Sequence, residues 1–222
     1  LALLAWFGVA AAEYQPQSWD GLVEVQPKRM DAAFLLPGAD FRPYTKVMID
    51  PTQVAFQKDW MKRMNDTRDL SRKVSQEEAD QILAGARANF DEVFAEEFTK
   101  AGYAVVTAPG ADVLRVSTAV VNLYINAPDV GTSARSKTYT TEAGEATLFV
   151  EVRDSQSGAL MGRVPDRNET QGIAGRTQAN RATNTAEFRN LFRNWAGTTI
   201  KGIEELKAHS PVPTDLKPKQ KM

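Results

Sequence analysis

The 222-residue chain contains no cysteine and a single histidine. The absence of cysteine excludes a disulfide framework, a thiolate metal site, a cysteine nucleophile and a lipidated cysteine anchor within this sequence. The histidine, His209, lies in a Pro- and Lys-rich stretch, where no rigid cleft is expected to hold an imidazole for a catalytic triad or a zinc site. We therefore interpret His209 as a solvated side chain, and we expect neither a metal ion nor another cofactor.

Neither sign of charge dominates the chain. Its 27 basic and 28 acidic side chains give a net charge of −1, so we expect no nucleic-acid partner. A composition of 42% hydrophobic and 25% charged residues is typical of a folded globular protein, and the length suits one ordinary domain.

Catalytic motifs are also scarce. No glycine-rich phosphate loop, nucleophile elbow or calcium-binding loop is present. Asp50, Asp166 and Glu169 offer carboxylates, but acid–base chemistry needs a defined separation and opposed pKa shifts, which the sequence does not fix. We expect a non-enzymatic protein with no catalytic residues. A carboxylate-dependent hydrolase or lyase acting on an envelope polymer is the alternative.

An apolar run that ends in small residues occupies residues 1–12, LALLAWFGVAAA. This pattern predicts part of a secretory signal peptide, with Ala10 and Ala12 in the small subsites of a signal peptidase. The run is shorter than the about 20 residues that span a membrane. We expect export to the periplasm and no transmembrane helix in the mature protein. Peripheral association with the outer membrane, and a buried N-terminal helix of a cytosolic domain, remain alternatives.

The rest of the chain divides into three predicted segments. Residues 13–43 show no sustained period and are interpreted as an extended arm packed on the domain. A single α+β domain is predicted for residues 44–208, and a disordered Pro- and Lys-rich tail for residues 209–222.

Two stretches within the domain have the apolar period of long helices. Ser75 and Glu78 form a capping box before the stripe at 79–98, and Gly102 ends that helix. Asn184 is the predicted cap of the second helix, which should bury Trp195 and place Gly202 close against the sheet. Strands are expected at 44–50, 103–107, 113–125, 145–153 and 159–164. This order predicts the α+β class, with a mostly antiparallel sheet of about five strands and both helices packed on one face.

Two long loops are candidates for a binding site. If 113–125, 145–153 and 159–164 form an antiparallel meander, the loops 126–144 and 165–183 lie at the same end of the sheet. Their arginines suit planar recognition of a carboxylate or phosphate, although Arg and Asp side chains can simply pair with each other. The candidate binding residues are Asn126, Asp129, Arg135, Tyr139, Arg163, Asp166 and Arg167.

We make a specific prediction for Arg163 and Asp166 because both lie where the last predicted strand leaves the sheet. An internal pair between Arg163 and either Asp166 or Asp129 would pin the two loops together. The alternative is an arginine that receives an anionic ligand. We favour the internal pair.

Several short motifs resemble those of a family of bacterial envelope proteins, many of them lipoproteins, that is classed as a domain of unknown function. The resemblance extends from about Ser18 to Trp195. It is carried by residues 18–22 (SWDGL), 37–41 (PGADF), 44–51 (YTKVMIDP), 126–129 (NAPD), 143–148 (AGEATL), 153–154 (RD), 163 (R), 166–167 (DR) and 195–196 (WA).

The resemblance implies an exported bacterial protein but supplies no activity. Lipoprotein members have a cysteine after the signal, whereas this chain has Ala10 to Ala12. The resulting hypothesis is an uncharacterised, non-enzymatic accessory or binding protein of the periplasm. Its partner would be an unknown envelope protein, or a cell-wall or other anionic ligand.

Overall fold

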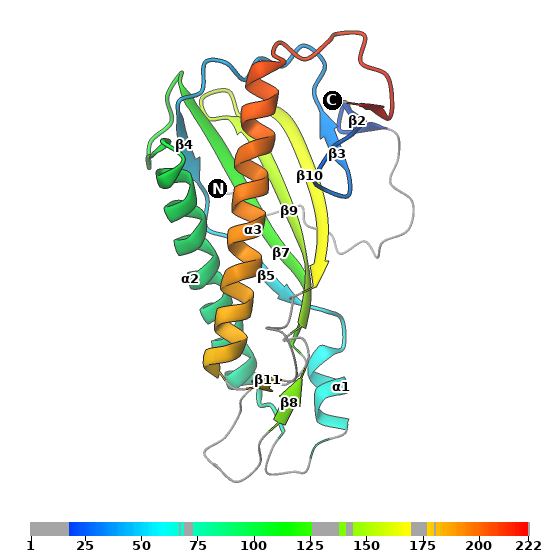
Figure 1. Ribbon diagram of the computed structural model, residues 1–222, viewed down its shortest axis with the longest axis vertical. Helices are drawn as coiled ribbons and strands as arrows, with labels where there is room; N and C mark the ends of the chain where they lie inside the picture. The colour runs from blue at the N-terminus through cyan, green and yellow to red at the C-terminus, as the bar shows by residue number, and fades with distance from the viewer. Residues whose placement is uncertain are drawn as a thin grey trace, which may run out of the picture.

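A computed structural model describes residues 18–66, 68, 73–125, 138–140, 144–169, 177–179 and 181–221. The predicted signal peptide at 1–12 lies outside these ranges. The described chain forms a mixed sheet with three helices, of which α2 and α3 are long (Figure 1). The predicted α+β class is therefore confirmed.

The main sheet contains ten strands in the order β1-β2-β3-β10-β9-β7-β4-β6, with β12 beside β2 and β5 beside β7. A separate two-stranded sheet pairs β8 with β11. The strands are β1 (Ser18–Trp19), β2 (Leu22–Gln26), β3 (Ala33–Leu35), β4 (Lys46–Ile49), β5 (Gln53–Phe56), β6 (Ala104–Val105), β7 (Val113–Ile125), β8 (Thr138–Thr140), β9 (Gly144–Asp154), β10 (Leu160–Glu169), β11 (Thr177–Ala179) and β12 (Gln220–Lys221).

The three longest strands, β7, β9 and β10, form the predicted antiparallel meander. β4 and β5 pair in parallel with β7, so the sheet is mixed rather than purely antiparallel. The sheet has more strands than the predicted five because several two- to five-residue segments join its edges. Segments this short carry too few residues to show an alternating pattern in the sequence.

The helices are α1 (Trp60–Asp66), α2 (Gln76–Lys100) and α3 (Arg181–Ala208). Figure 1 shows α2 and α3 side by side on the same face of the sheet. The predicted capping box of α2 is present, since Glu78 N donates to Ser75 Oγ and Ser75 N donates to the Glu78 carboxylate. Gly102, with φ of +92°, follows the end of that helix as predicted. α3 begins three residues before the predicted cap, so the assignment of Asn184 as the N-cap was wrong.

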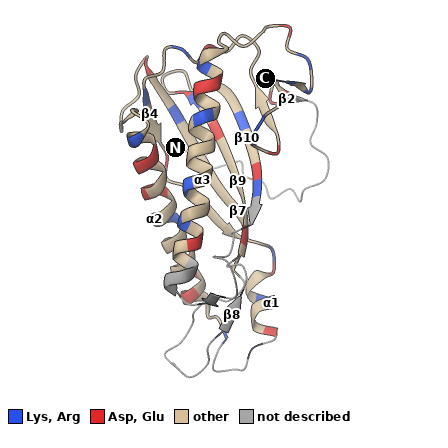
Figure 2. Cartoon of the chain, in the orientation of Figure 1, with Lys and Arg blue, Asp and Glu red and all other residues tan. Residues whose placement is uncertain are grey.

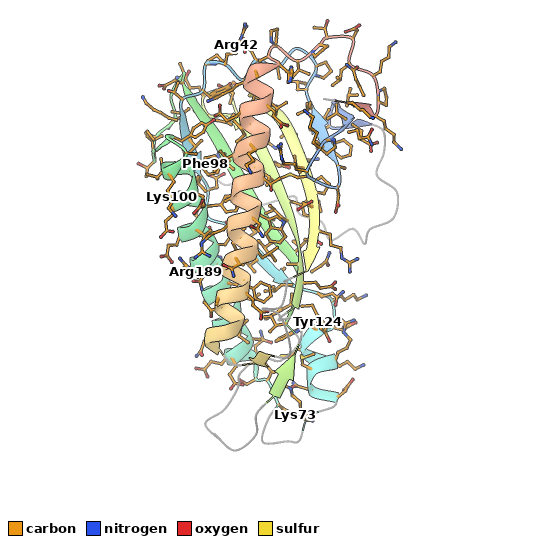
Figure 3. All side chains as sticks on the ribbon, viewed as in Figure 1. Arg42, Lys73, Phe98, Lys100, Tyr124 and Arg189 are labelled. Atoms are coloured by element: carbon orange, nitrogen blue, oxygen red, sulfur yellow. The ribbon has the colours of Figure 1, made fainter. Side chains whose placement is uncertain are left out.

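Aromatic rings fill the space where α2 meets α3 and the sheet. Phe90 stacks on Phe94 with ring centroids 4.1 Å apart, and it contacts Phe192 of α3 edge-on at 5.1 Å. Arg189 of α3 joins the two helices from outside, because its Nη1 donates to Glu92 Oε2 at 2.8 Å (Figure 3). Trp195 is 1% exposed, which confirms its predicted place in the core.

Both ends of the described chain differ from the prediction. β1, β2 and β3 of the predicted arm are strands of the main sheet. The predicted disordered tail is instead packed: Val212 is 1% exposed, Leu216 is also buried, and β12 pairs with β2. Composition suggested disorder, but Val212 is fixed by backbone hydrogen bonds with Gly38 and Ala39. Two well-placed apolar residues therefore outweigh the prolines and lysines around them.

Candidate functional site

The two long loops do meet at one end of the molecule. β8 lies within the first loop and β11 within the second, and these two strands pair. Figure 1 shows the pair at the lower end, opposite the hairpin that joins β9 to β10. Asn126, Asp129 and Arg135 lie outside the described residues. Tyr139 is placed by its backbone alone, opposite Gln178.

Asp166 faces the helices and is 5% exposed. Its Oδ2 accepts a hydrogen bond from Trp195 Nε1 at 2.8 Å, and its Oδ1 accepts one from Asp31 N at 3.2 Å. A buried carboxylate that satisfies a buried indole N–H fixes the strand to the helix. These contacts give Asp166 a structural role, linking β10, α3 and the β2–β3 loop.

Arg163 points to the opposite face of the sheet. Its Nε donates to Glu151 Oε1 at 2.8 Å, and its Nη1 lies 3.0 Å from Asp20 Oδ2. The predicted Arg163–Asp166 pair was therefore wrong. Residues three positions apart on a strand face opposite sides, and β10 continues to Glu169 instead of ending at 164. Arg163 does have an internal acidic partner, but this partner is Glu151 of β9, so the pair does not join the two loops.

Arg167 is the most exposed of these residues, with 64% of its side chain accessible. Its Nη2 lies 2.7 Å from Glu145 Oε2, while its backbone N donates to Asp31 Oδ2. Figure 2 shows basic and acidic residues next to one another along β9 and β10. In the described part of the predicted site, Arg163 and Arg167 are thus paired with glutamates of β9, and Asp166 is hydrogen-bonded to an indole and a backbone N–H.

The carboxylates considered for catalysis are not gathered in one place. Asp50 accepts hydrogen bonds from Arg115 and Ser117, on the face of the sheet away from the helices. Asp166 lies on the helix-covered face, so the sheet separates the two carboxylates. The side chain of Glu169 is not described. Within the described ranges, no group of three or more His, Asp or Glu side chains is arranged to hold a metal ion.

A cavity of about 110 Å³ lies between the C-terminal half of α3 and the sheet; sequence analysis did not identify it. We call it the α3 cavity. Its floor on the sheet is formed by Val25, Leu35, Val150, Val152 and Gly162, and its wall on α3 by Thr199, Gly202, Ile203 and Leu206. The lining is therefore mainly aliphatic.

Small residues on α3 create this space. A Cβ placed on Gly202 would have no atom within 4 Å, so the expectation that Gly202 packs closely on the sheet was wrong. Thr199, which is 6% exposed, also lines the cavity. Its Oγ1 has no hydrogen-bond partner in the described part of the chain. The run of small residues was visible in the sequence, but only the distance from α3 to the sheet distinguishes close packing from a void.

Ionisable residues border the mouth of the α3 cavity. Lys28 and Arg29 come from the β2–β3 loop, and Glu205 and His209 come from the end of α3. Arg29 Nη1 lies 2.5 Å from Glu205 Oε1, so an ion pair joins the loop to the helix. Hydrogen bonding by the Arg29 guanidinium, the largest cause, lowers the pKa of the Glu205 carboxyl.

The protein is therefore an α+β protein in which two long helices cover one face of a mixed sheet. The α3 cavity lies between the second of these helices and the sheet. Several solved structures have a distantly similar fold. The PelC dodecamer from Paraburkholderia phytofirmans is 11% identical, with 75% of this chain and 94% of that chain covered and a TM-score of 0.37. Protein XCC0632 from Xanthomonas campestris, of family DUF330, is 10% identical, with 78% and 88% covered and a TM-score of 0.37. Similarity this distant carries no argument about function.

The chain belongs to DUF3313, a family of proteins of unknown function, whose model matches residues 14–199. This match confirms the predicted resemblance to a family of unknown function and its extent. No curated protein matches the chain. In the described ranges, no helix is long and apolar enough to cross a membrane.

Proposed function

We propose that this protein is a non-enzymatic binding protein of the bacterial periplasm that holds a hydrophobic molecule in the α3 cavity. The observation that carries the proposal is the cavity itself, with its aliphatic lining and its opening between the β2–β3 loop and α3. The predicted signal peptide and the resemblance to envelope proteins support the location.

The size of the cavity supports a binding role. At about 110 Å³ it approaches the roughly 150 Å³ apolar cavity that takes up benzene in another protein. Protein cores are close-packed, so the side chains that line an apolar space of this size have fewer contacts than they would in a filled core. A hydrophobic ligand that fills it would recover contacts that the empty protein lacks.

The charged residues support binding rather than catalysis. Buried and half-buried ionisable groups on β9 and β10 have partners within the protein, as Arg163 has in Glu151, Asp154 in Tyr44 and Asp166 in Trp195. Catalytic acids and bases are instead aimed at a site that substrate can reach. We therefore propose no reaction for this protein.

The location has a simple test. Cell fractionation should find the processed chain in the periplasm. Recovery of the unprocessed chain from the inner membrane, or of the chain from the cytosol, would contradict the proposed location.

The binding function is tested with 1-octanol, a neutral molecule with one alkyl chain, titrated by isothermal calorimetry. Gly202→Leu places a side chain in the cavity and should abolish the binding seen with the unmodified protein. Gly197→Leu is the matched control, because Gly197 also lies in α3 with open space around it but does not line the cavity. Gly197→Leu should bind 1-octanol normally. Absence of binding to the unmodified protein, or equal binding by both variants, would overturn the proposal.

A further inference from the structure

We infer that the ligand of the α3 cavity is an amphipathic anion with a single alkyl chain, whose chain enters the cavity and whose head group lies at the mouth against Lys28 and Arg29. This inference rests on the proposed binding function and identifies the chemical class of its ligand.

The volume of the cavity limits the ligand to one chain. The space, about 110 Å³, is smaller than the benzene-binding cavity cited above. The end of one alkyl chain fits, whereas the paired chains of a phospholipid do not. The volume of the cavity therefore favours a monomeric single-chain amphiphile over a lipid that is still in a bilayer.

The charges at the mouth favour an anionic head group. Among the described residues that line the cavity, Lys28, Arg29, Arg163 and His209 are the Lys, Arg and His side chains, and Glu205 is the acidic one. The guanidinium of Arg163 is directed to Glu151 and Asp20, so it does not serve the mouth. Lys28 and Arg29 therefore face a single carboxylate, and no ion pair of Lys28 is found in the described part of the chain.

Lys28 and Arg29 also lie where they can contact the head group of a bound ligand. Both are exposed and belong to the loop that borders the cavity, while the floor behind them is apolar. An alkyl chain can therefore be buried while its charged end stays at the surface, which avoids the cost of burying an ion. Carboxylate and phosphate groups are the natural partners of this Lys–Arg pair.

The Arg29–Glu205 ion pair should affect the binding of anionic and neutral ligands differently. Glu205 occupies the guanidinium that a ligand head group would use, so the two carboxylates compete for Arg29. Removing the charge of Glu205 should strengthen the binding of an anionic ligand. It should leave the binding of a neutral ligand of the same chain length unchanged.

The experiment compares three ligands with the same eight-carbon chain: octanoate, 1-octanol and octyltrimethylammonium. Calorimetric affinity should fall in that order. The difference between octanoate and 1-octanol should shrink by about two- to fivefold in Lys28→Gln, the size expected for an exposed ion pair. Lys62→Gln, which removes an exposed lysine of α1, should leave all three affinities unchanged.

Glu205→Gln should tighten octanoate binding by about two- to fivefold without affecting 1-octanol. Glu204→Gln is its control, because Glu204 is the neighbouring carboxylate on α3 that accepts a hydrogen bond from the Tyr103 hydroxyl and pairs with Lys207, and it does not line the cavity. Thermal unfolding of each variant verifies that it is folded.

The outcomes separate the two proposals. If the three ligands bind equally and Gly202→Leu still abolishes binding, the anionic preference is wrong while the hydrophobic-binding function stands. If 1-octanol does not bind, or Gly202→Leu leaves octanoate binding unchanged, the cavity is not the binding site and both proposals fail. Tight binding to phosphatidylglycerol vesicles with no binding to octanoate would overturn the single-chain ligand in favour of a membrane surface.

Discussion

Where α2 meets α3 and the sheet, large rings occupy the interface, whereas under the C-terminal half of α3 small and aliphatic residues leave a cavity. The aromatic region contains Phe90, Phe94 and Phe98, with ring contacts as close as 4.1 Å. In the cavity region, the surface of α3 that faces the sheet carries Thr199 and Gly202 instead. The layer formed by α2 and α3 is therefore tightly packed in one region and leaves an accessible space in the other. This difference depends on the volume of the side chains in each region.

The largest expected effect comes from opening the filled region. Trp195→Ala removes a buried indole that contacts Phe192 and leaves Asp166 without its Nε1 donor. We expect a loss of about 3–5 kcal/mol in the free energy of unfolding, measured by urea titration. A loss below about 1 kcal/mol would show that the indole contributes little to packing.

Alkaline pH should also destabilise the folded protein. Burial, followed by the hydrogen bond and charge of Asp154, raises the pKa of Tyr44 to about 12. Burial and Glu204 likewise raise the pKa of Tyr103, whose ring packs edge-on against Phe98. Because the unfolded tyrosines deprotonate near pH 10, the folded state retains more protons above that pH.

The stability contributed by the two tyrosines is fully present below about pH 10 and is lost as the pH rises toward 12. Thermal unfolding measured across this range should show a falling midpoint. Tyr44→Phe combined with Tyr103→Phe should flatten the fall, and an equally steep fall in that variant would contradict the assignment.

A smaller effect should distinguish the two glycines of α3. Gly202→Ala and Gly197→Ala should each raise stability by about 0.5–1 kcal/mol, since both are helical positions with open space around the new methyl group. Leucine should add about 1 kcal/mol more at 202, where it fills the cavity. Replacing alanine by leucine at position 197 should add less to the free energy of unfolding. Equal gains at both positions would argue against a cavity at 202.

The smallest effect concerns the unpaired hydroxyl of the cavity. Thr199→Val keeps the shape of the side chain and removes a buried Oγ1 that has no partner in the described ranges. We expect a gain of up to about 1 kcal/mol in the free energy of unfolding, because the desolvation cost of that oxygen disappears. A loss of similar size would indicate that Oγ1 is satisfied, for example by a bound water molecule.

Local signals in the sequence predicted much of the fold. The capping box and apolar stripe gave α2, and the long alternating runs gave β7 and β9 with nearly their observed bounds. The short strands β1 to β3 were missed because two to five residues show no clear alternating pattern, and β3 joins the main sheet only by pairing with the distant β10. The packed C-terminal segment was missed because composition does not reveal where Val212 docks.

The site was harder to predict than the fold. The β8–β11 pair confirms that the two long loops lie together, which followed from strand order alone. The ion pairs depended on the true length of β10: once the strand continues past 164, Arg163 and Asp166 must face opposite sides. The cavity depended on the separation between α3 and the sheet, which has no signature in one sequence. The presence of Gly202 therefore indicated an unusual position in the helix, but it did not distinguish close packing from a cavity.

The central claim is that hydrophobic molecules enter under α3 and not in the aromatic region, and methyl NMR tests it most directly. With 1-octanol added, the methyl resonances of Ile203 and Val152, which line the cavity, should shift in a saturable way. Those of Val93, buried on α2, should stay in place. Gly202→Leu should abolish the shifts at Val152. Unchanged Ile203 and Val152 resonances in the unmodified protein, or equal shifts at Val93, would contradict the account.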